Sequence, residues 1–248
     1  MRILGLDIGS RTVDAVWLDN GRIVDSGIAD SGHDPHAVAL EFAQRHAYDK
    51  LVATGYGRHA AREALGAVVV TEIKAYALGA RAAFPLASGV LDIGGQDTKV
   101  IALGADGRVV DFEMNDKCAA GTGKFLEVMA RALGFDLAGM ALSALSAKEA
   151  VAISSMCTVF AESEVTGLVH KGEDRSAISR GLHESIAKRT LASLRRVGAG
   201  APLVFAGGVA NNPAMVELIR AGFDGEVFVP SEAQLVGAHG AALSGAAE

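Results

Sequence analysis

Two cysteines, Cys118 and Cys157, have the surroundings in this sequence that most favour chemistry. Residues 119–124 after Cys118 read Ala-Ala-Gly-Thr-Gly-Lys, and an apolar pattern with helical spacing begins at Phe125. Cys157 also comes directly before a predicted helix. Because the first N–H groups of a helix are unpaired and its dipole is positive at that end, both positions favour a thiolate or an anionic cluster. The alternative is that each cysteine is a small buried hydrophobic residue.

Further candidate residues lie in two similar strand–turn–strand segments. Each has an apolar strand that ends in Asp-Ile-Gly, at Asp7 in the first segment and at Asp92 in the second. Backbone N–H groups and the hydroxyls of Ser10 and Thr12 can hold phosphate oxygens, and Asp7 can hold Mg²⁺ through water. The first segment alone is equally compatible with an ordinary hairpin. Because the pattern occurs twice in matching surroundings, the sequence predicts two related lobes that face one ligand.

A third segment joins a strand to a helix through two glycines. Residues 203–206 are apolar, Gly207 and Gly208 follow, and a helix is predicted from about Pro213. Such a junction lets the backbone approach a flat ring or a phosphate without a side-chain clash. Together the three segments predict a nucleotide site.

Predicted strands and helices alternate along the chain, which indicates an α/β architecture. Strands are predicted at 2–9, 13–18, 23–29, 51–58, 68–71, within 90–103, and at 109–114, 203–206 and 226–229. Helices are predicted at 35–46, 72–84, 125–133, 176–197 and 233–243, after Cys157 and from Pro213, with a loop and a short helix in 134–149.

The composition restricts the class of protein. The chain has 248 residues, 50% of them hydrophobic, so it can bury a sizeable core in one large domain or two small ones. Its net charge is −6 and it has no long basic run, so neither nucleic acid nor an anionic membrane is an expected partner. No signal peptide or long apolar stretch is seen, so we expect a cytoplasmic protein. In that reducing compartment, metal or redox use of the cysteines is favoured over a disulfide.

These motifs carry a resemblance that spans nearly the whole chain. Residues 7–10 and 92–97 resemble the two phosphate motifs, and residues 206–211 the adenosine motif, of the acetate and sugar kinase, chaperone and actin superfamily. More narrowly, the chain is similar to the ATP-dependent activators of 2-hydroxyacyl-CoA dehydratases, which are relatives of the ATPase subunits of benzoyl-CoA reductase. Residues 115–123 and 157–165 resemble the cysteine signatures of that family, and residues 234–243 resemble its C-terminus.

The resemblance implies an actin-like ATPase fold, with two ribonuclease-H-like lobes and an ATP cleft between them. We expect residues 1–86 and 230–248 to form the first lobe and residues 87–229 to form the second, which carries the cysteines. The resemblance also implies a homodimer in which Cys118 and Cys157 of both subunits hold one [4Fe–4S] cluster. The count agrees, because a cubane usually needs four thiolates and one chain offers two.

The activity implied by the resemblance is ATP hydrolysis coupled to the transfer of one low-potential electron, in anaerobic metabolism. The implied partners are an iron–sulfur dehydratase or reductase and, as electron donor, ferredoxin or flavodoxin. Tyr76 stands where many members of the family have histidine. The choice between a 2-hydroxyacyl-CoA dehydratase, a benzoyl-CoA reductase and a double-cubane-cluster reductase as partner therefore stays open.

Our hypothesis for the mechanism gives Asp7 and Asp92 the positioning of Mg²⁺ and gives Gln96 the orientation of the attacking water. Closure of the lobes on ATP then moves the helices that start near the two cysteines and gates electron transfer. The residues expected to bind ATP or ADP are Gly9, Ser10, Arg11, Thr12, Gly94, Gly95, Gly121, Thr122, Gly123, Gly207, Gly208 and Asn211.

Two other classes of function stay open. One is a small-molecule kinase of the same superfamily with incidental cysteines, for which 248 residues leave little room for a substrate domain. The other is an ATP-switched interaction module without metal. A P-loop at Lys124 is excluded, because the pattern G-x-x-x-x-G-K-[ST] is absent. Asp97 and Lys99 are expected to pair on a strand face rather than to act directly in catalysis.

Overall fold

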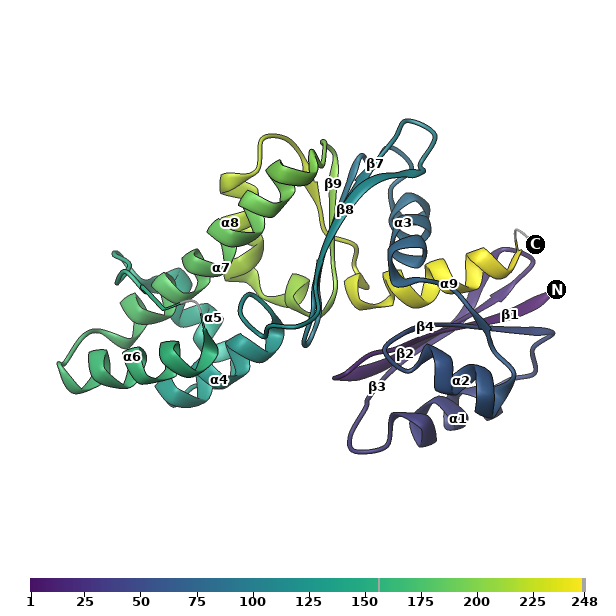
Figure 1. Cartoon of the computed structure of the whole chain (residues 1–248), viewed down its shortest axis with the longest axis horizontal. Helices are drawn as coiled ribbons and strands as arrows, with labels where there is room; N and C mark the ends of the chain where they lie inside the picture. Colours follow the sequence, from purple (N-terminus) through teal and green to yellow (C-terminus); the bar gives the residue numbers. More distant parts are fainter. Residues whose placement is uncertain (156, 247–248) are drawn as a thin grey trace.

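The computed structural model of the chain describes residues 1–155 and 157–246 and contains two five-stranded sheets (Figure 1). The first sheet has the order β3-β2-β1-β4-β5, with β1 (Arg2–Ile8), β2 (Thr12–Asp19), β3 (Arg22–Asp30), β4 (Lys50–Gly55) and β5 (Val68–Val69). The second has the order β10-β9-β6-β7-β8, with β6 (Gly89–Ile93), β7 (Thr98–Leu103), β8 (Val109–Asn115), β9 (Leu203–Ala206) and β10 (Val227–Phe228).

The two sheets are built in the same way. In each, three consecutive strands pair antiparallel, and a later strand joins the first of them in parallel: β1–β3 with β4, and β6–β8 with β9. The register is also the same, because Asp7 lies opposite Asp14 and Asp92 lies opposite Lys99. The internal repeat predicted from the two Asp-Ile-Gly segments is therefore confirmed.

Helices cover both faces of the first sheet. α1 (Pro35–Arg45) and α2 (Arg58–Leu65) pack on one face, where Leu4, Leu6 and Trp17 are buried. α9 (Val236–Ala246) covers the other face, and α3 (Glu72–Ala83) packs against α9 and also contacts β6, β7 and β8 (Figure 1). The two helices approach so closely that a Cβ atom on Gly240 would collide with the Ala75 carbonyl oxygen. α3 and α9 thus connect the two sheets.

Five further helices gather on the second sheet and at one end of it (Figure 1). They are α4 (Gly123–Leu133), α5 (Leu137–Ser146), α6 (Thr158–His170), α7 (Arg175–Val197) and α8 (Pro213–Gly222). α7 packs on β7 and β8, and α6 packs against α4. Phe125, Met129, Leu182 and Phe205 are fully or almost fully buried in the core that these elements share. In the described part of the chain no single helix is long and apolar enough to cross a membrane, and α4 and α5 pass that test only as a pair bent by 79°.

Most elements lie where the sequence predicts them, and the differences have local reasons. The sequence analysis misses α2, a short helix of eight residues whose apolar positions are only three alanines and Leu65. The region expected to hold a loop and a short helix holds α5, which has ten residues. The last helix begins at Val236 instead of Ala233, because Ala233–Leu235 forms a 3₁₀ turn. The division of the chain into 1–86 with 230–248 and 87–229 stays a prediction; the strands of the two sheets fall on its two sides.

Candidate functional site

A cavity of about 540 Å³ lies between the two sheets, within the size range of small-molecule sites. Its wall comes from both hairpin turns, the starts of α3 and α4, helix α5 and the segment after β9. The predicted site residues on this wall are Asp7, Gly9, Ser10, Arg11, Thr12, Gly94, Gly95, Gln96, Gly123, Gly207, Gly208 and Asn211. The fold thus brings the three predicted segments to one place. Asp92, Gly121 and Thr122 are predicted site residues that do not line this cavity.

The two hairpin turns close with the same hydrogen bond. The Gly9 N–H donates to the Thr12 carbonyl oxygen at 2.9 Å, and the Gly94 N–H donates to the Asp97 carbonyl oxygen at 3.0 Å. The turns also touch each other, since a Cβ atom on Gly95 would collide with the side chain of Arg11. Consecutive backbone N–H groups in such turns bind phosphate oxygens, so the two turns can hold one phosphate chain from both sides.

Two carboxyl groups of the first sheet lie side by side at the cavity. Asp7 on β1 and Asp14 on β2 are cross-strand neighbours, each 6% exposed. Burial raises the pKa of Asp7 well above its ordinary value, and the charge of Asp14 raises it further. Burial likewise raises the pKa of Asp14 to about 7. A hydrogen bond with the Thr12 side chain opposes this rise, but Asp14 Oδ1 is buried and has no hydrogen-bond partner among the described residues.

Lys99 occupies the corresponding position in the second sheet. Its Nζ lies 2.8 Å from Asp92 Oδ2 and 2.5 Å from Asp97 Oδ2, and its side chain is 2% exposed. Burial lowers the pKa of Lys99, but the carboxylates around it outweigh burial and raise the pKa well above its ordinary value. Burial raises the pKa of Asp92 to about 6 against the opposing charge of Lys99. Asp92 is fully buried and does not line the cavity, and its carboxylate is already paired with the ammonium group of Lys99.

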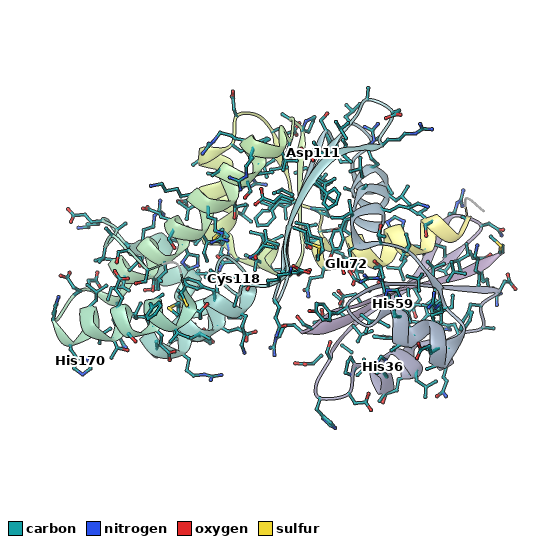
Figure 2. The ribbon with its side chains drawn as sticks, in the orientation of Figure 1. His36, His59, Glu72, Asp111, Cys118 and His170 are labelled. Atoms are coloured by element: carbon teal, nitrogen blue, oxygen red, sulfur yellow. The ribbon has the colours of Figure 1, made fainter. Side chains whose placement is uncertain are left out.

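The ion pairs of Lys99 extend into the first sheet. Lys99 Nζ lies 3.0 Å from Glu72 Oε2 at the start of α3, a region that Figure 2 shows between the two sheets. Glu72 Oε1 accepts from Arg58 Nη1 at 3.1 Å, and Arg58 Nη1 also donates to the Gly55 carbonyl oxygen at 2.7 Å. The Tyr76 ring lies beside this chain of contacts, with its centroid 5.0 Å from Lys99 Nζ. A chain of ion pairs from Asp92 through Lys99 and Glu72 to Arg58 thus connects the second sheet to the first half of the chain.

The other end of the cavity is apolar. Leu126, Leu137, Ala138, Ala141, Leu142 and Val209 line it. Leu137 and Leu142 are 44% and 62% exposed, although both are large apolar side chains on α5. Gly207 and Gly208 add no side chain to the opposite wall, and Asn211 Nδ2 donates to Gln234 Oε1 at 3.0 Å. A flat aromatic ring fits such a wall, and a polyphosphate fits the turns at the other end.

Both cysteines are free thiols and are exposed. Cys118 lies where β8 leads into α4 (Figure 2), and its carbonyl oxygen accepts from Asn115 Nδ2 at 2.8 Å. Cys157 is the residue directly before α6, as the sequence predicts, and its side chain makes no capping hydrogen bond. The segment before Cys157 is held by Glu164, whose carboxylate accepts from Ser154 N, Ser154 Oγ and Ser155 N. The helices that follow the two cysteines pack together in one core.

The start of α4 is bonded to the second hairpin turn. The Gly123 N–H donates to the Gly94 carbonyl oxygen at 2.9 Å, and the Lys124 N–H donates to the Gly95 carbonyl oxygen at 2.7 Å. Of the two predicted residues before this point, Gly121 lines a separate small cavity. Thr122 is fully buried, and its hydroxyl donates to the Ala119 carbonyl oxygen. The second hairpin turn is therefore in direct backbone contact with the start of α4, five residues after Cys118.

Sequence reasoning did not select Asp14 or Glu72 and did not foresee that Lys99 joins three carboxylates. A signal for Asp14 was present, because it occupies the same position after Asp-Ile-Gly as Lys99 does. Glu72 is far from both hairpins in the chain and enters the site only because α3 packs between the sheets. No pattern in its own segment indicates that contact.

Comparisons with known proteins agree with this arrangement. Residues 4–245 match the BadF/BadG/BcrA/BcrD ATPase family. The chain is 40% identical to the activator of lactoyl-CoA dehydratase from Anaerotignum propionicum, over 98% of this chain and 96% of that protein. Its structure is similar to that of the activator of the 2-hydroxyisocaproyl-CoA dehydratase from Clostridium difficile with bound ADPNP, with a TM-score of 0.90, 39% identity and coverage of 98% and 94%. For (R)-2-hydroxyglutaryl-CoA dehydratase component A from Acidaminococcus fermentans, the TM-score is 0.91, the identity 37% and the coverage 100% of both chains. The predicted actin-like ATPase fold is confirmed.

Proposed function

The chain belongs to the BadF/BadG/BcrA/BcrD ATPase family, and we propose that it is an ATP-dependent activator of a dehydratase. In this proposal it hydrolyses ATP in the cavity and couples hydrolysis to the transfer of a low-potential electron from a [4Fe–4S] cluster to a 2-hydroxyacyl-CoA dehydratase-type partner. Relatives named as dehydratase activators support this role. The single observation that carries the proposal is the pair of backbone hydrogen bonds between the second hairpin turn and the start of α4, close to Cys118.

The nucleotide occupies the cavity with its phosphates at the turns. Ser10 and Thr12 in the first turn and Gly94 and Gly95 in the second face the phosphate chain. Their position on the cavity wall supports this assignment. The adenine ring lies against the apolar side chains of α5 and the glycine pair after β9. Gln96, also on the wall, orients the attacking water, because a neutral amide can align water without removing its proton.

Magnesium fits the acidic side of the cavity. Mg²⁺ is commonly held by one or two carboxylates together with substrate phosphates, and Asp7 lies on the wall beside the first turn. When bound, Mg²⁺ neutralises charge on the phosphates. Asp92 fits this role less well, because Lys99 already neutralises it behind the wall.

The two cysteines fit an iron–sulfur cluster shared between two copies of the chain. Within residues 1–155 and 157–246 no group of three or more potential metal-binding side chains occurs, so one chain supplies only two thiolates, Cys118 and Cys157. A symmetric pair supplies the four that a cubane needs. Val159 and Phe160, each 68% exposed, follow Cys157 and offer apolar surface for a partner copy to cover. When bound, the cluster supplies the low-potential electron.

Coupling runs through α4 and α6. A change at the second turn, such as phosphate binding or release, displaces the start of α4 through the two backbone hydrogen bonds. Because α4 packs against α6, both cysteine segments respond together. Movement of these helices changes the exposure of the Cys118 and Cys157 site and its fit to the partner enzyme.

The partner is inferred from the relatives. Three of the relatives that match over nearly the full chain are named as dehydratase activators, which favours a dehydratase over the benzoyl-CoA reductase relative that matches 69% of this chain. A double-cubane-cluster reductase is a third possible partner class. We propose a cytoplasmic homodimer that receives its electron from ferredoxin or flavodoxin.

The test is to purify the protein under strict anaerobiosis and to measure iron, acid-labile sulfide and molecular mass on the same sample. We expect about four irons and four sulfides per dimer, and absorbance in the visible range that Cys118→Ala abolishes. An iron-free monomer after attempted cluster reconstitution would refute the proposal. ATP hydrolysis without iron would then leave a small-molecule kinase, which a screen of phosphoryl acceptors would identify.

A further inference from the structure

One position of the internal repeat carries opposite charges in the two sheets. Asp14 and Lys99 each lie directly across from the aspartate of an Asp-Ile-Gly segment. In the second sheet this position holds an ammonium group that neutralises Asp92. In the first sheet it holds a carboxyl group beside Asp7. The same backbone arrangement therefore forms an ion pair in one sheet and a pair of acids in the other.

The acid pair is held in place and is partly unpartnered. A Cβ atom on Gly55 or on Gly237 would collide with a carboxylate oxygen of Asp7, so the backbone packs tightly around this side chain. Gly207 packs in the same way against Asp92 Oδ1, which also has no hydrogen-bond partner among the described residues, but Asp92 does not line the cavity. Asp14 is 6% exposed, lies on the cavity wall, and its Oδ1 has no hydrogen-bond partner in the part of the chain that the structure describes. An unpartnered buried carboxylate oxygen at a cavity is a ready ligand atom for a cation.

The charges around Asp7 and Asp14 favour the binding of a cation between them. Glu72 and Asp92 add negative potential at Asp7, and Lys99 reduces it. Lys99 is shared among Asp92, Asp97 and Glu72, so its single charge is already outnumbered. Arg11, the basic side chain of the first turn, is paired with Glu127. A divalent cation with a preference for oxygen ligands matches this site in charge and in ligand type.

We propose that Asp7 and Asp14 together hold the divalent cation of the site, and that Asp92 does not. This inference rests on the proposed function only in identifying the cation as the Mg²⁺ that accompanies ATP. Lys99 takes the place of a metal ion in the second sheet, where it holds Asp92 and Asp97 in position. Since Asp97 follows Gln96 directly, Lys99 is a positioning residue for the turn that carries Gln96.

Direct binding of Mn²⁺ tests this assignment without ATP turnover. The anaerobically purified protein is titrated with Mn²⁺ at pH 8, and free Mn²⁺ is measured by its EPR signal. We expect wild type to bind one Mn²⁺ per chain at the acid pair. Asp7→Asn and Asp14→Asn should each weaken binding by about 10-fold or more, because each removes a charged ligand. Asp14→Lys copies the second sheet, so its ammonium should pair with Asp7 and abolish binding in a folded protein.

Two control variants distinguish Mn²⁺ binding at Asp7 and Asp14 from non-specific binding by other carboxylates. Asp111→Asn removes an exposed carboxylate on β8 and should bind Mn²⁺ like wild type. Asp92→Asn should weaken Mn²⁺ binding much less than Asp14→Asn does, because Asp92 adds negative potential at Asp7 but its carboxylate is bound to Lys99 and does not line the cavity. Absence of Mn²⁺ binding to wild type, an unchanged affinity in folded Asp14→Asn, or an equal loss in Asp92→Asn would each overturn the assignment. ATP binding is measured separately by equilibrium dialysis, and a chain that binds Mn²⁺ at the acid pair but no ATP would refute the proposed function and leave the cation site standing.

Discussion

Arg11 and Glu127 join the first hairpin turn to the helix that follows Cys118. Arg11 Nε lies 2.8 Å from Glu127 Oε1, and both side chains lie on the cavity wall. Glu127 Oε2 also lies 3.3 Å from Lys124 Nζ in the first turn of α4. A phosphate that enters the cavity competes with Glu127 for the Arg11 guanidinium. The ion pair therefore offers a second connection between nucleotide binding and α4, beside the backbone bonds from Gly94 and Gly95.

Replacing Glu127 by Gln should weaken this connection. We expect Glu127→Gln to keep ATP hydrolysis within a few-fold of wild type, since the substitution leaves both Gln96 and Arg11 in place. The effect of ATP on the rate at which a chelator removes iron from the proposed cluster should become clearly smaller. Glu217→Gln is the matched control, because it breaks a 2.9 Å ion pair with Arg180 away from the cavity. Equal ATP effects in Glu127→Gln and wild type would contradict this role.

Replacing Gln96 by Ala should separate binding from hydrolysis. Gln96 lies on the wall between the two glycines of the second turn and Asp97. If it orients the water, Gln96→Ala should lower kcat on the order of 10²-fold, the scale of one positioned catalytic group, and leave the Kd for ATP nearly unchanged. Gln44→Ala, at an exposed position of α1, serves as the control. Unchanged turnover in Gln96→Ala would remove this residue from the mechanism.

The sequence predicts the fold and the phosphate turns well, because these features depend on neighbours in the chain. The two Asp-Ile-Gly segments define both hairpins and their common register by local pattern alone. The same pattern makes Asp7 and Asp92 look equivalent, and the structure separates them through their cross-strand neighbours Asp14 and Lys99. The contact from Lys99 to Glu72 depends on how α3 packs between the sheets, which no local pattern encodes.

Removal of the Lys99 charge should destabilise the chain strongly. Lys99→Met leaves Asp92 and Asp97 with uncompensated buried charge, a change that typically costs about 3–5 kcal/mol in the free energy of unfolding. Urea unfolding of Lys99→Met, Asp92→Asn and the double variant forms a mutant cycle. We expect the double variant to recover part of the loss, because Asn needs no cation. Lys188→Met, at an exposed position of α7, should be neutral, and an equally small effect of Lys99→Met would show that the ion pairs contribute little.

Glu164 should make the segment before Cys157 sensitive to acid. Its carboxylate accepts from the Ser154 N–H and hydroxyl at 2.9 Å and from the Ser155 N–H at 2.8 Å. Burial opposes ionisation of this group, but the hydrogen bonds from Ser154 and Ser155 outweigh it and lower the pKa from 4.5 to about 2. Because the folded-state pKa is the lower one, ionised Glu164 stabilises the fold above pH 4.5, and this contribution is lost as the pH falls toward 2.

The corresponding experiment compares Glu164→Gln with wild type by urea unfolding of iron-free protein at several pH values from 7 to 3. We expect Glu164→Gln to be less stable at pH 7 and the difference to shrink below about pH 4.5, where the wild-type carboxylate loses its advantage. The difference at pH 7 should be modest, since the side chain is partly exposed and solvent screens its charge. Glu162→Gln, an exposed neighbour on α6, should show neither effect. A difference between wild type and Glu164→Gln that stays constant across this pH range would mean that the ionised carboxylate does not hold the segment before Cys157.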